Sequence, residues 1–132
     1  MFDGLPALLD KAASQGLQMG VCTNKIEHLS YKLLTEIGIM DKFNSVVGGD
    51  TLPIMKPNPE PLLEAVKRLG IDPAHSLMFG DSETDILTAQ AAHVPVIAVS
   101  FGYTPQHVSA FNPTHVIDHY KEAWPIIETY LS

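Results

Sequence analysis

Residues 76–85, Ser-Leu-Met-Phe-Gly-Asp-Ser-Glu-Thr-Asp, connect a short apolar run to a polar turn and the start of a helix. The run 76–79 has the length and composition of a buried strand, and a helical pattern follows from about Glu83 to Ala92. A strand that leads directly into a helix is typical of a parallel sheet covered by helices. Ligands of such sheets bind beyond the carboxyl ends of the strands, where Gly80 and Asp81 are expected.

The same alternation of strand and helix patterns runs through the whole chain. We expect further strands at 17–22, 43–47, 94–100 and 114–117, and further helices between residues 5 and 15, 29 and 37, 59 and 69, and 122 and 130. The pattern predicts an α/β fold, a Rossmann-like parallel sheet with helices on both faces. Residues 1–132 are expected to form a single domain.

Charge and composition argue against several classes of partner. Eight Lys and Arg residues against fifteen Asp and Glu residues give a net charge of −7, which repels nucleic acid and anionic membranes. No apolar run approaches the roughly 18 residues of a membrane span, and no secretory signal is expected. The lone cysteine, Cys22, cannot form an internal disulfide, so we expect a cytoplasmic protein.

The two aspartates around the first helical turn after Gly80 are candidate metal ligands. Asp81 and Asp85 are four residues apart at a strand-to-helix junction, so both can face one point. Hard carboxylate oxygens of this kind suit Mg²⁺. The alternative is a capping box of Ser82 with Asp85, which would leave Asp81 without an explanation.

Two other positions are candidates for binding an anion. Thr23 and Asn24 follow the expected strand 17–22, where a hydroxyl and free helical N–H groups can hold a phosphate. The alternative is a helix cap, with Asn24 and Glu27 as a capping-box variant. Lys56 lies in a proline-rich loop that could fix its ammonium, although most lysines are simply solvated. The chain has a single cysteine to accompany its six histidines, so we interpret the histidines as surface or loop residues and not as a zinc site.

In their order, these segments resemble the haloacid dehalogenase superfamily. Residues 21–25, Val-Cys-Thr-Asn-Lys, resemble its second motif, Lys56 in Lys-Pro-Asn-Pro-Glu-Pro-Leu resembles its third, and Gly80-Asp81-Ser82 with Asp85 resembles its fourth. Residues 47–50, Val-Gly-Gly-Asp, and 101–103, Phe-Gly-Tyr, also look like those of phosphoglycolate phosphatases. The resemblance covers essentially the whole chain.

The resemblance implies hydrolysis of a small phosphorylated metabolite through an aspartyl-phosphate. By this resemblance Thr23, Asn24 and Lys56 bind the phosphate, with Thr23 and Lys56 acting in catalysis. Asp81 would bind Mg²⁺, and Asp85 would support the metal or its waters. The substrate stays open between phosphoglycolate, sugar phosphates and nucleotide monophosphates.

One family motif has no counterpart here. The first motif, a strand followed by Asp-x-Asp-Gly-Thr, should supply the nucleophile, but Phe2-Asp3-Gly4 matches better the hinge between a cap domain and the core. We therefore expect a truncated chain, inactive alone, without the cap and without the central strand between those ending at Cys22 and Phe79. The two edges exposed in this way favour a swapped segment or a homo-oligomer. His93, where the family usually has a glycine, predicts a mildly strained left-handed backbone.

Two other functions are possible from the sequence. A non-catalytic remnant of the family could bind phosphate, metal or a protein partner without turnover. An unrelated flavodoxin-like binding module would leave Lys56 and Asp81 far apart in space.

Overall fold

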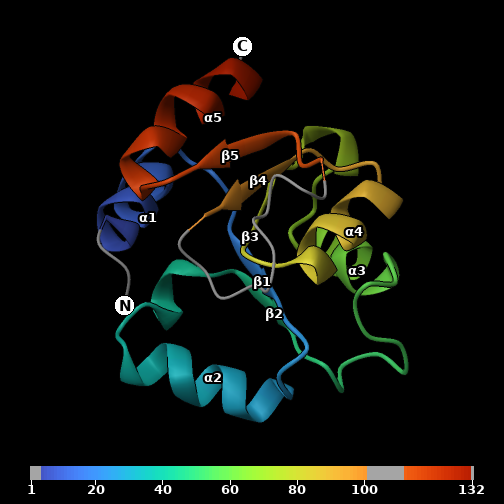
Figure 1. Ribbon diagram of the computed structural model, residues 1–132. Coiled ribbons are helices and arrows are strands. Elements are labelled where there is room, and N and C mark those ends of the chain that lie inside the picture. The colour runs from blue at the N-terminus through green and yellow to red at the C-terminus, as the bar shows by residue number, and fades with distance from the viewer. Residues whose placement is uncertain (1–3, 101–111, 132) are drawn as a thin grey trace.

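The computed structural model describes residues 4–100 and 112–131, which form an α/β fold in which every strand pair is parallel. Figure 1 shows the strands in the middle of the molecule and the helices around them. The α/β prediction is thus confirmed. The five strands are β1 Gly20–Cys22, β2 Ser45–Val47, β3 Met78–Gly80, β4 Val96–Val99 and β5 His115–Ile117.

The described strands make two sheets. One contains β1 and β2, and the other has the order β3-β4-β5, with Gly80 opposite Ala98 and Ala98 opposite Val116. No backbone pairing joins β1 to β3 within residues 4–100 and 112–131. This arrangement agrees with the expectation that a strand is missing between the strands that end near Cys22 and Phe79.

Helices cover the two faces of these sheets. Helix α3 packs on β1 and β2, whereas α4 packs on β3 and β4. Figure 1 places α1 and α5 on the opposite side of β4 from α3 and α4. The helices are α1 Leu5–Ser14, α2 Glu27–Glu36, α3 Glu60–Arg68, α4 Glu83–Ala91 and α5 Ala123–Leu131.

Strand β4 is buried on both faces because its side chains alternate between two apolar clusters. Val96 and Ala98 pack with side chains of α3 and α4, and Ile97 and Val99 pack with side chains of α5. All four residues of β4 are buried, as expected for a strand of a parallel sheet covered on both faces. This double packing fixes the sheet that carries Gly80 and Asp81.

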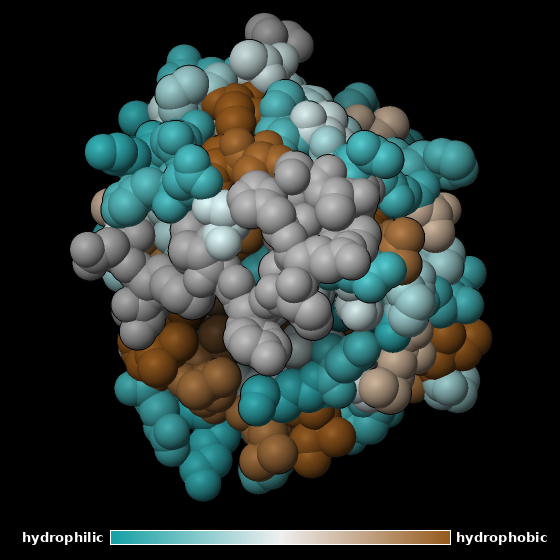
Figure 2. Space-filling model, viewed as in Figure 1, coloured by the Kyte–Doolittle hydropathy of each residue, from teal (hydrophilic) through white to brown (hydrophobic). Residues whose placement is uncertain are grey.

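Helix α2 leaves large apolar side chains exposed on its outer side. It buries Ser30 and Leu34, while Leu29 and Leu33 each remain 44% exposed. Figure 2 shows hydrophobic surface in the lower part of the view, where Figure 1 places α2.

The strands are shorter than the sequence pattern predicts. Of the apolar runs 17–22 and 76–79, only Gly20–Cys22 and residues 78–79 belong to strands, and β3 continues to Gly80. The residues before them in each run have irregular structure. The expected segments 101–103 and 2–3 lie outside the described residues. In the part of the chain that the structure describes, no helix has the length and apolar character needed to cross a membrane.

His93 has the predicted left-handed backbone, with a φ of 59°, directly after α4. A side chain with a Cβ atom is strained in this region by about 1–2 kcal/mol, whereas glycine is not. The expectation drawn from the sequence is confirmed.

We predict that His93→Gly raises the free energy of unfolding by about 0.5–1 kcal/mol, because the relief of strain exceeds the extra entropy of an unfolded glycine. Urea denaturation followed by circular dichroism measures this change. Ala91→Gly is the matched control, since Ala91 is exposed and helical and should only lose stability. Equal losses in both variants would contradict the strain argument.

Candidate active site

A cavity of about 240 Å³ lies at the carboxyl ends of the strands, between β1 on one side and β3 and β4 on the other. It is lined by residues at or just beyond the ends of three strands, in the loop before α3, in the first turn of α4 and in the short helix after β5. These residues are Cys22, Thr23, Lys56, Phe79, Gly80, Asp81, Asp85, Val99 and Tyr120. The structure therefore brings together four of the five predicted site residues, Thr23, Lys56, Asp81 and Asp85.

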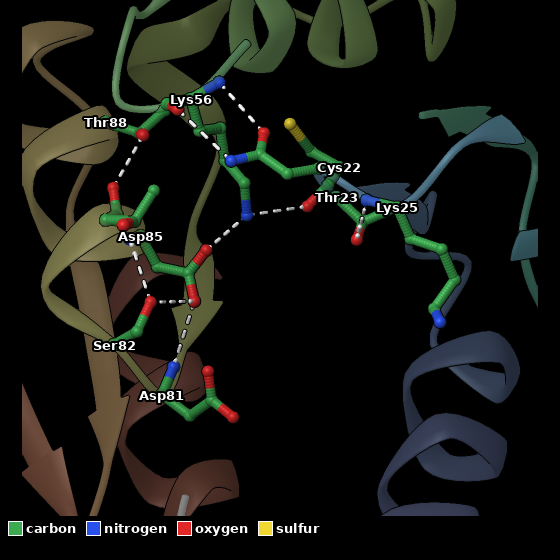
Figure 3. Close-up of polar contacts among 10 residues, drawn as sticks. Cys22, Thr23, Lys25, Lys56, Asp81, Ser82, Asp85 and Thr88 are labelled. Carbon is green, nitrogen blue, oxygen red and sulfur yellow. Dashed lines mark hydrogen bonds and ion pairs between the residues drawn. The ribbon is translucent and has the colours of Figure 1, made fainter. Parts of the chain in front are cut away.

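Lys56 reaches across the cavity between the two sheets. Its ammonium donates to the Cys22 carbonyl oxygen at 3.1 Å and pairs with the Asp85 carboxylate (Figure 3). Its side chain is only 8% exposed, so the interpretation of Lys56 as an ordinary solvated lysine is wrong. A buried ammonium at this position can offset negative charge that enters the cavity.

The Asp85 carboxylate is held by three groups. Besides Lys56, it accepts from the Asp81 backbone N–H at 3.1 Å and from the Ser82 hydroxyl at 3.2 Å (Figure 3). Ser82 is the N-cap of α4, and its hydroxyl oxygen accepts from the Asp85 N–H. The capping-box alternative is thus partly right. Ser82 caps the helix, but the Asp85 carboxylate accepts from the Asp81 N–H, whereas a capping box would use the N–H of Ser82. A Cβ atom at Gly80 would lie 2.3 Å from the Asp85 Cβ, so glycine is required there.

Asp81 also lines the cavity, and Figure 3 draws no dashed line to its carboxylate from the other residues shown. Burial raises the pKa of Asp81, and the nearby Asp85 charge raises it further. A bound cation would relieve both effects. Mg²⁺ typically uses one or two carboxylates together with waters and substrate phosphates, so Asp81 with Asp85 nearby fits this ion. No cluster of three or more His, Cys, Asp or Glu side chains suited to a metal occurs in the described ranges.

Thr23 follows β1 and lines the cavity, but it does not cap a helix. Its hydroxyl oxygen accepts from the Lys25 N–H at 3.2 Å, which closes a tight turn. Helix α2 begins at Glu27 with Ile26 at the N-cap, and the Glu27 N–H donates to the Asp50 carboxylate at 2.7 Å. The cap interpretations of Thr23 and of Asn24 with Glu27 are therefore wrong, and the Thr23 hydroxyl proton can point to a ligand.

Asn24 lies beside the cavity and is not among the residues that line it. Its side-chain oxygen accepts from the Lys56 N–H at 3.0 Å, and its side-chain nitrogen donates to the Lys56 carbonyl oxygen at 3.1 Å. The sequence motif predicted Asn24 near the phosphate but gave no indication of this contact.

The loop 48–51 braces the turn that carries Thr23. The Gly49 N–H donates to the Lys25 carbonyl oxygen at 2.8 Å, and the Thr51 hydroxyl donates to the Glu27 carboxylate at 2.8 Å. A Cβ atom at Gly49 would lie only 2.1 Å from the Asn24 carbonyl oxygen. The sequence analysis noted residues 47–50 only for their resemblance to phosphoglycolate phosphatases and did not recognise this structural role.

Tyr120 is a cavity residue that the sequence analysis missed. It begins the 3₁₀ helix Tyr120–Glu122 after β5. Burial raises its pKa, and the charge of Asp81 raises it further, so its phenol lies near the candidate metal ligand. No motif marks Tyr120, because a tyrosine after a short strand is an ordinary core residue in sequence terms.

The chain matches known proteins over most of its length. Residues 1–99 match the family model described as haloacid dehalogenase-like hydrolase. A protein from Rhodospirillum rubrum named phosphoglycolate phosphatase is 42% identical over 120 residues, which are 91% of this chain and 50% of that protein. One of the same name from Yersinia pestis is 36% identical over 128 residues, 96% of this chain and 55% of that protein. The chain spans about half the length of the curated relatives it matches.

Solved structures agree with this match. The crystal structure of a predicted phosphoglycolate phosphatase from Haemophilus somnus superposes with a TM-score of 0.90 at 28% identity, covering 95% of this chain and 56% of the other. A haloacid dehalogenase-superfamily hydrolase from Geobacter sulfurreducens superposes with a TM-score of 0.82 at 30% identity, covering 96% of this chain and 56% of the other.

We predict that Gly49→Ala lowers the free energy of unfolding by roughly 1–3 kcal/mol, because the added methyl group forces the turn at Asn24 to move. Chemical denaturation measures the loss. Gly16→Ala is the control that isolates the cost of a positive φ from the cost of a steric clash. A Cβ atom at Gly16 meets no atom within 4 Å, but the residue has a φ of 77°, so this variant should lose only about 1 kcal/mol of unfolding free energy. A Gly49→Ala protein as stable as the unchanged chain would show that the loop 48–51 does not hold the turn at Asn24 in place.

We also predict that Cys22 reacts slowly with thiol reagents at neutral pH. Burial raises the pKa of Cys22 from 9.0 to about 11, although the Lys56 charge lowers it. The labelling rate should therefore keep rising up to about pH 11. Because the folded state holds this proton more tightly than the unfolded chain, stability should fall as the pH rises above 9.0. Labelling in denaturant, where the rate levels off near the ordinary pKa, is the control.

Proposed function

Because the chain belongs to the haloacid dehalogenase-like hydrolase family, we propose that it is the catalytic core of a Mg²⁺-dependent phosphomonoester hydrolase that resembles phosphoglycolate phosphatases. One observation carries this proposal: Thr23, Lys56 and Asp81 come from three separate segments and line one cavity. The flavodoxin-like alternative is wrong, since it requires Lys56 and Asp81 to be far apart.

In this proposal the phosphate lies between Thr23 and Lys56. The Thr23 hydroxyl donates to a phosphoryl oxygen while its oxygen keeps the Lys25 N–H bond. The Lys56 ammonium, fixed by Cys22 and Asp85, stabilises the negative charge that builds up during transfer. Thr23 and Lys56 thus contribute positioning and charge, whereas the covalent step needs a separate nucleophile.

Asp81 would hold Mg²⁺, and Asp85 would stay next to the metal as an outer partner. This division follows from their contacts, because Asp85 already binds Lys56, Ser82 and the Asp81 N–H, whereas Asp81 carries a raised pKa. When bound, the metal supplies charge neutralisation and orientation of the phosphate. The acidic pocket thereby becomes suitable for an anionic substrate in spite of the net charge of −7.

The aspartate nucleophile is proposed to come from a further strand between β1 and β3. Two facts support this: the described strands do not pair across that gap, and Asp81 and Asp85 are the only carboxylates in the described lining of the cavity. Attack by the aspartate on phosphorus would expel the alcohol and form an aspartyl-phosphate, which water then hydrolyses. We therefore propose that these 132 residues alone turn over negligible substrate.

The substrate class is a small phosphorylated metabolite, with phosphoglycolate as the first compound to test. The relatives named phosphoglycolate phosphatase support this choice, while sugar phosphates and nucleotide monophosphates belong in the same assay. We place the reaction in the cytoplasm, without nucleic acid or membrane partners. A swapped segment or a second copy of the chain would supply the proposed strand between β1 and β3.

The second candidate function is a non-catalytic phosphate- or metal-binding protein. It is favoured by the same observation that no third carboxylate lies in the described part of the cavity. The two candidates differ in whether the native protein carries the strand with the paired aspartates. Intact mass and peptide mapping of the protein isolated from its own cell, followed by assays with the three substrate classes, separate a hydrolase from a binding protein.

We predict that Asp81→Asn weakens Mg²⁺ binding by at least about tenfold, since even outer-shell partners change metal affinity by about 10–100-fold. NMR shift changes during a MgCl₂ titration of the 132-residue chain measure this affinity. Asp41→Asn removes the same charge from an exposed position and should bind Mg²⁺ as the unchanged chain does. Equal affinities of the Asp81→Asn and Asp41→Asn proteins would exclude Asp81 as the ligand.

A further inference from the structure

Asn24 makes an unusually complete contact with a residue far along the chain. Both polar ends of its side chain bond to the backbone of Lys56, 32 residues later: the oxygen accepts from the N–H at 3.0 Å and the nitrogen donates to the carbonyl oxygen at 3.1 Å (Figure 3). This pair of hydrogen bonds, one accepted and one donated, resembles the pair that a residue of a neighbouring β-strand would make with the Lys56 backbone. It fixes where the Lys56 backbone lies relative to the end of β1.

The other end of Lys56 is fixed by the same short segment. Its ammonium donates to the carbonyl oxygen of Cys22, two residues before Asn24. A lysine has a flexible four-carbon stem, so its ammonium is well placed only when both the backbone and the charged end are held. The turn at residues 22–24 provides both contacts, and Asp85 supplies the opposing charge.

We infer that the side chain of Asn24 has a positioning role: it acts on the phosphate through Lys56 and does not itself bind the phosphate. This inference rests on the proposed function, because it assumes that the cavity receives a phosphate. Two observations carry it: Asn24 is not in the described lining of the cavity, and the oxygen and nitrogen of its side chain both bond to Lys56. It replaces the role expected from the sequence motif.

The chemistry of the contact predicts a graded series of variants. Asparagine is matched to Lys56 because it accepts one bond and donates the other. Asn24→Asp keeps the acceptor for the Lys56 N–H but faces the Lys56 carbonyl oxygen with a second oxygen. Asn24→Ala removes both bonds and leaves two backbone groups without these partners.

Hydrogen exchange of the Lys56 amide in the 132-residue chain is the first test. We expect Asn24→Ala to speed this exchange by about tenfold or more, the equivalent of one lost hydrogen bond, and Asn24→Asp to keep most of the protection. Asn58→Ala is the matched control, because it removes a side-chain bond to Glu60 N–H in the same loop and should leave Lys56 protected. Unchanged amides in β4 show that each variant is folded.

Binding of inorganic phosphate in the presence of Mg²⁺ is the second test. We expect Asn24→Ala to raise the phosphate Kd by about fivefold to tenfold in the unchanged background and by less than twofold in a Lys56→Met background. This non-additive result is the signature of a residue that acts through Lys56. Equal effects in both backgrounds would show that Asn24 contacts the phosphate itself and would overturn the inference.

The two tests separate failure of this inference from failure of the proposed function. If the unchanged chain binds no phosphate, even with Mg²⁺, the result counts against the proposed function. The exchange rate of the Lys56 amide is then the one test of whether Asn24 positions Lys56. A Lys56 amide that stays protected in a folded Asn24→Ala protein would overturn the inference whatever the phosphate result.

Discussion

The contact of the Lys56 ammonium with the Cys22 carbonyl and the Asp85 carboxylate is the interaction on which the site depends. It joins the sheet of β1 and β2 to helix α4, which packs on the sheet of β3, β4 and β5. Among the described residues, the two sheets share no backbone pairing. A buried charge pair is a poor source of net stability, because desolvation offsets much of the attraction. The pair instead fixes the positions of the Lys56 and Asp85 side chains relative to each other. Removal of either partner would leave an uncompensated buried charge.

The surroundings of this contact are built to keep it in one arrangement. Asn24 holds the Lys56 backbone, Ser82 and the Asp81 N–H hold Asp85, and Gly80 leaves room for Asp85 against the strand. Each of these groups therefore constrains the position of Lys56 or Asp85. Thr23, with its hydroxyl proton, and Asp81, with its raised pKa, face the cavity alongside Lys56.

A cavity of this kind suits a doubly charged ligand only when a cation accompanies it. The one positive side chain among the described lining residues, Lys56, is already paired with Asp85, and Asp81 adds a negative charge. Mg²⁺ at Asp81 would therefore make phosphate binding favourable in a strongly acidic protein.

The amino-acid sequence was sufficient for the α/β fold, for the strand ends that carry Thr23 and Asp81, and for the left-handed backbone of His93. These features depend on local periodicity and on residue type, which can be read along the chain. The contacts of Asn24 with Lys56, the close approach of Gly49 to Asn24 and the place of Tyr120 depended on the tertiary structure. They join segments 25 or more residues apart, and no local pattern records which distant backbone group a side chain will meet once the sheets and helices have packed.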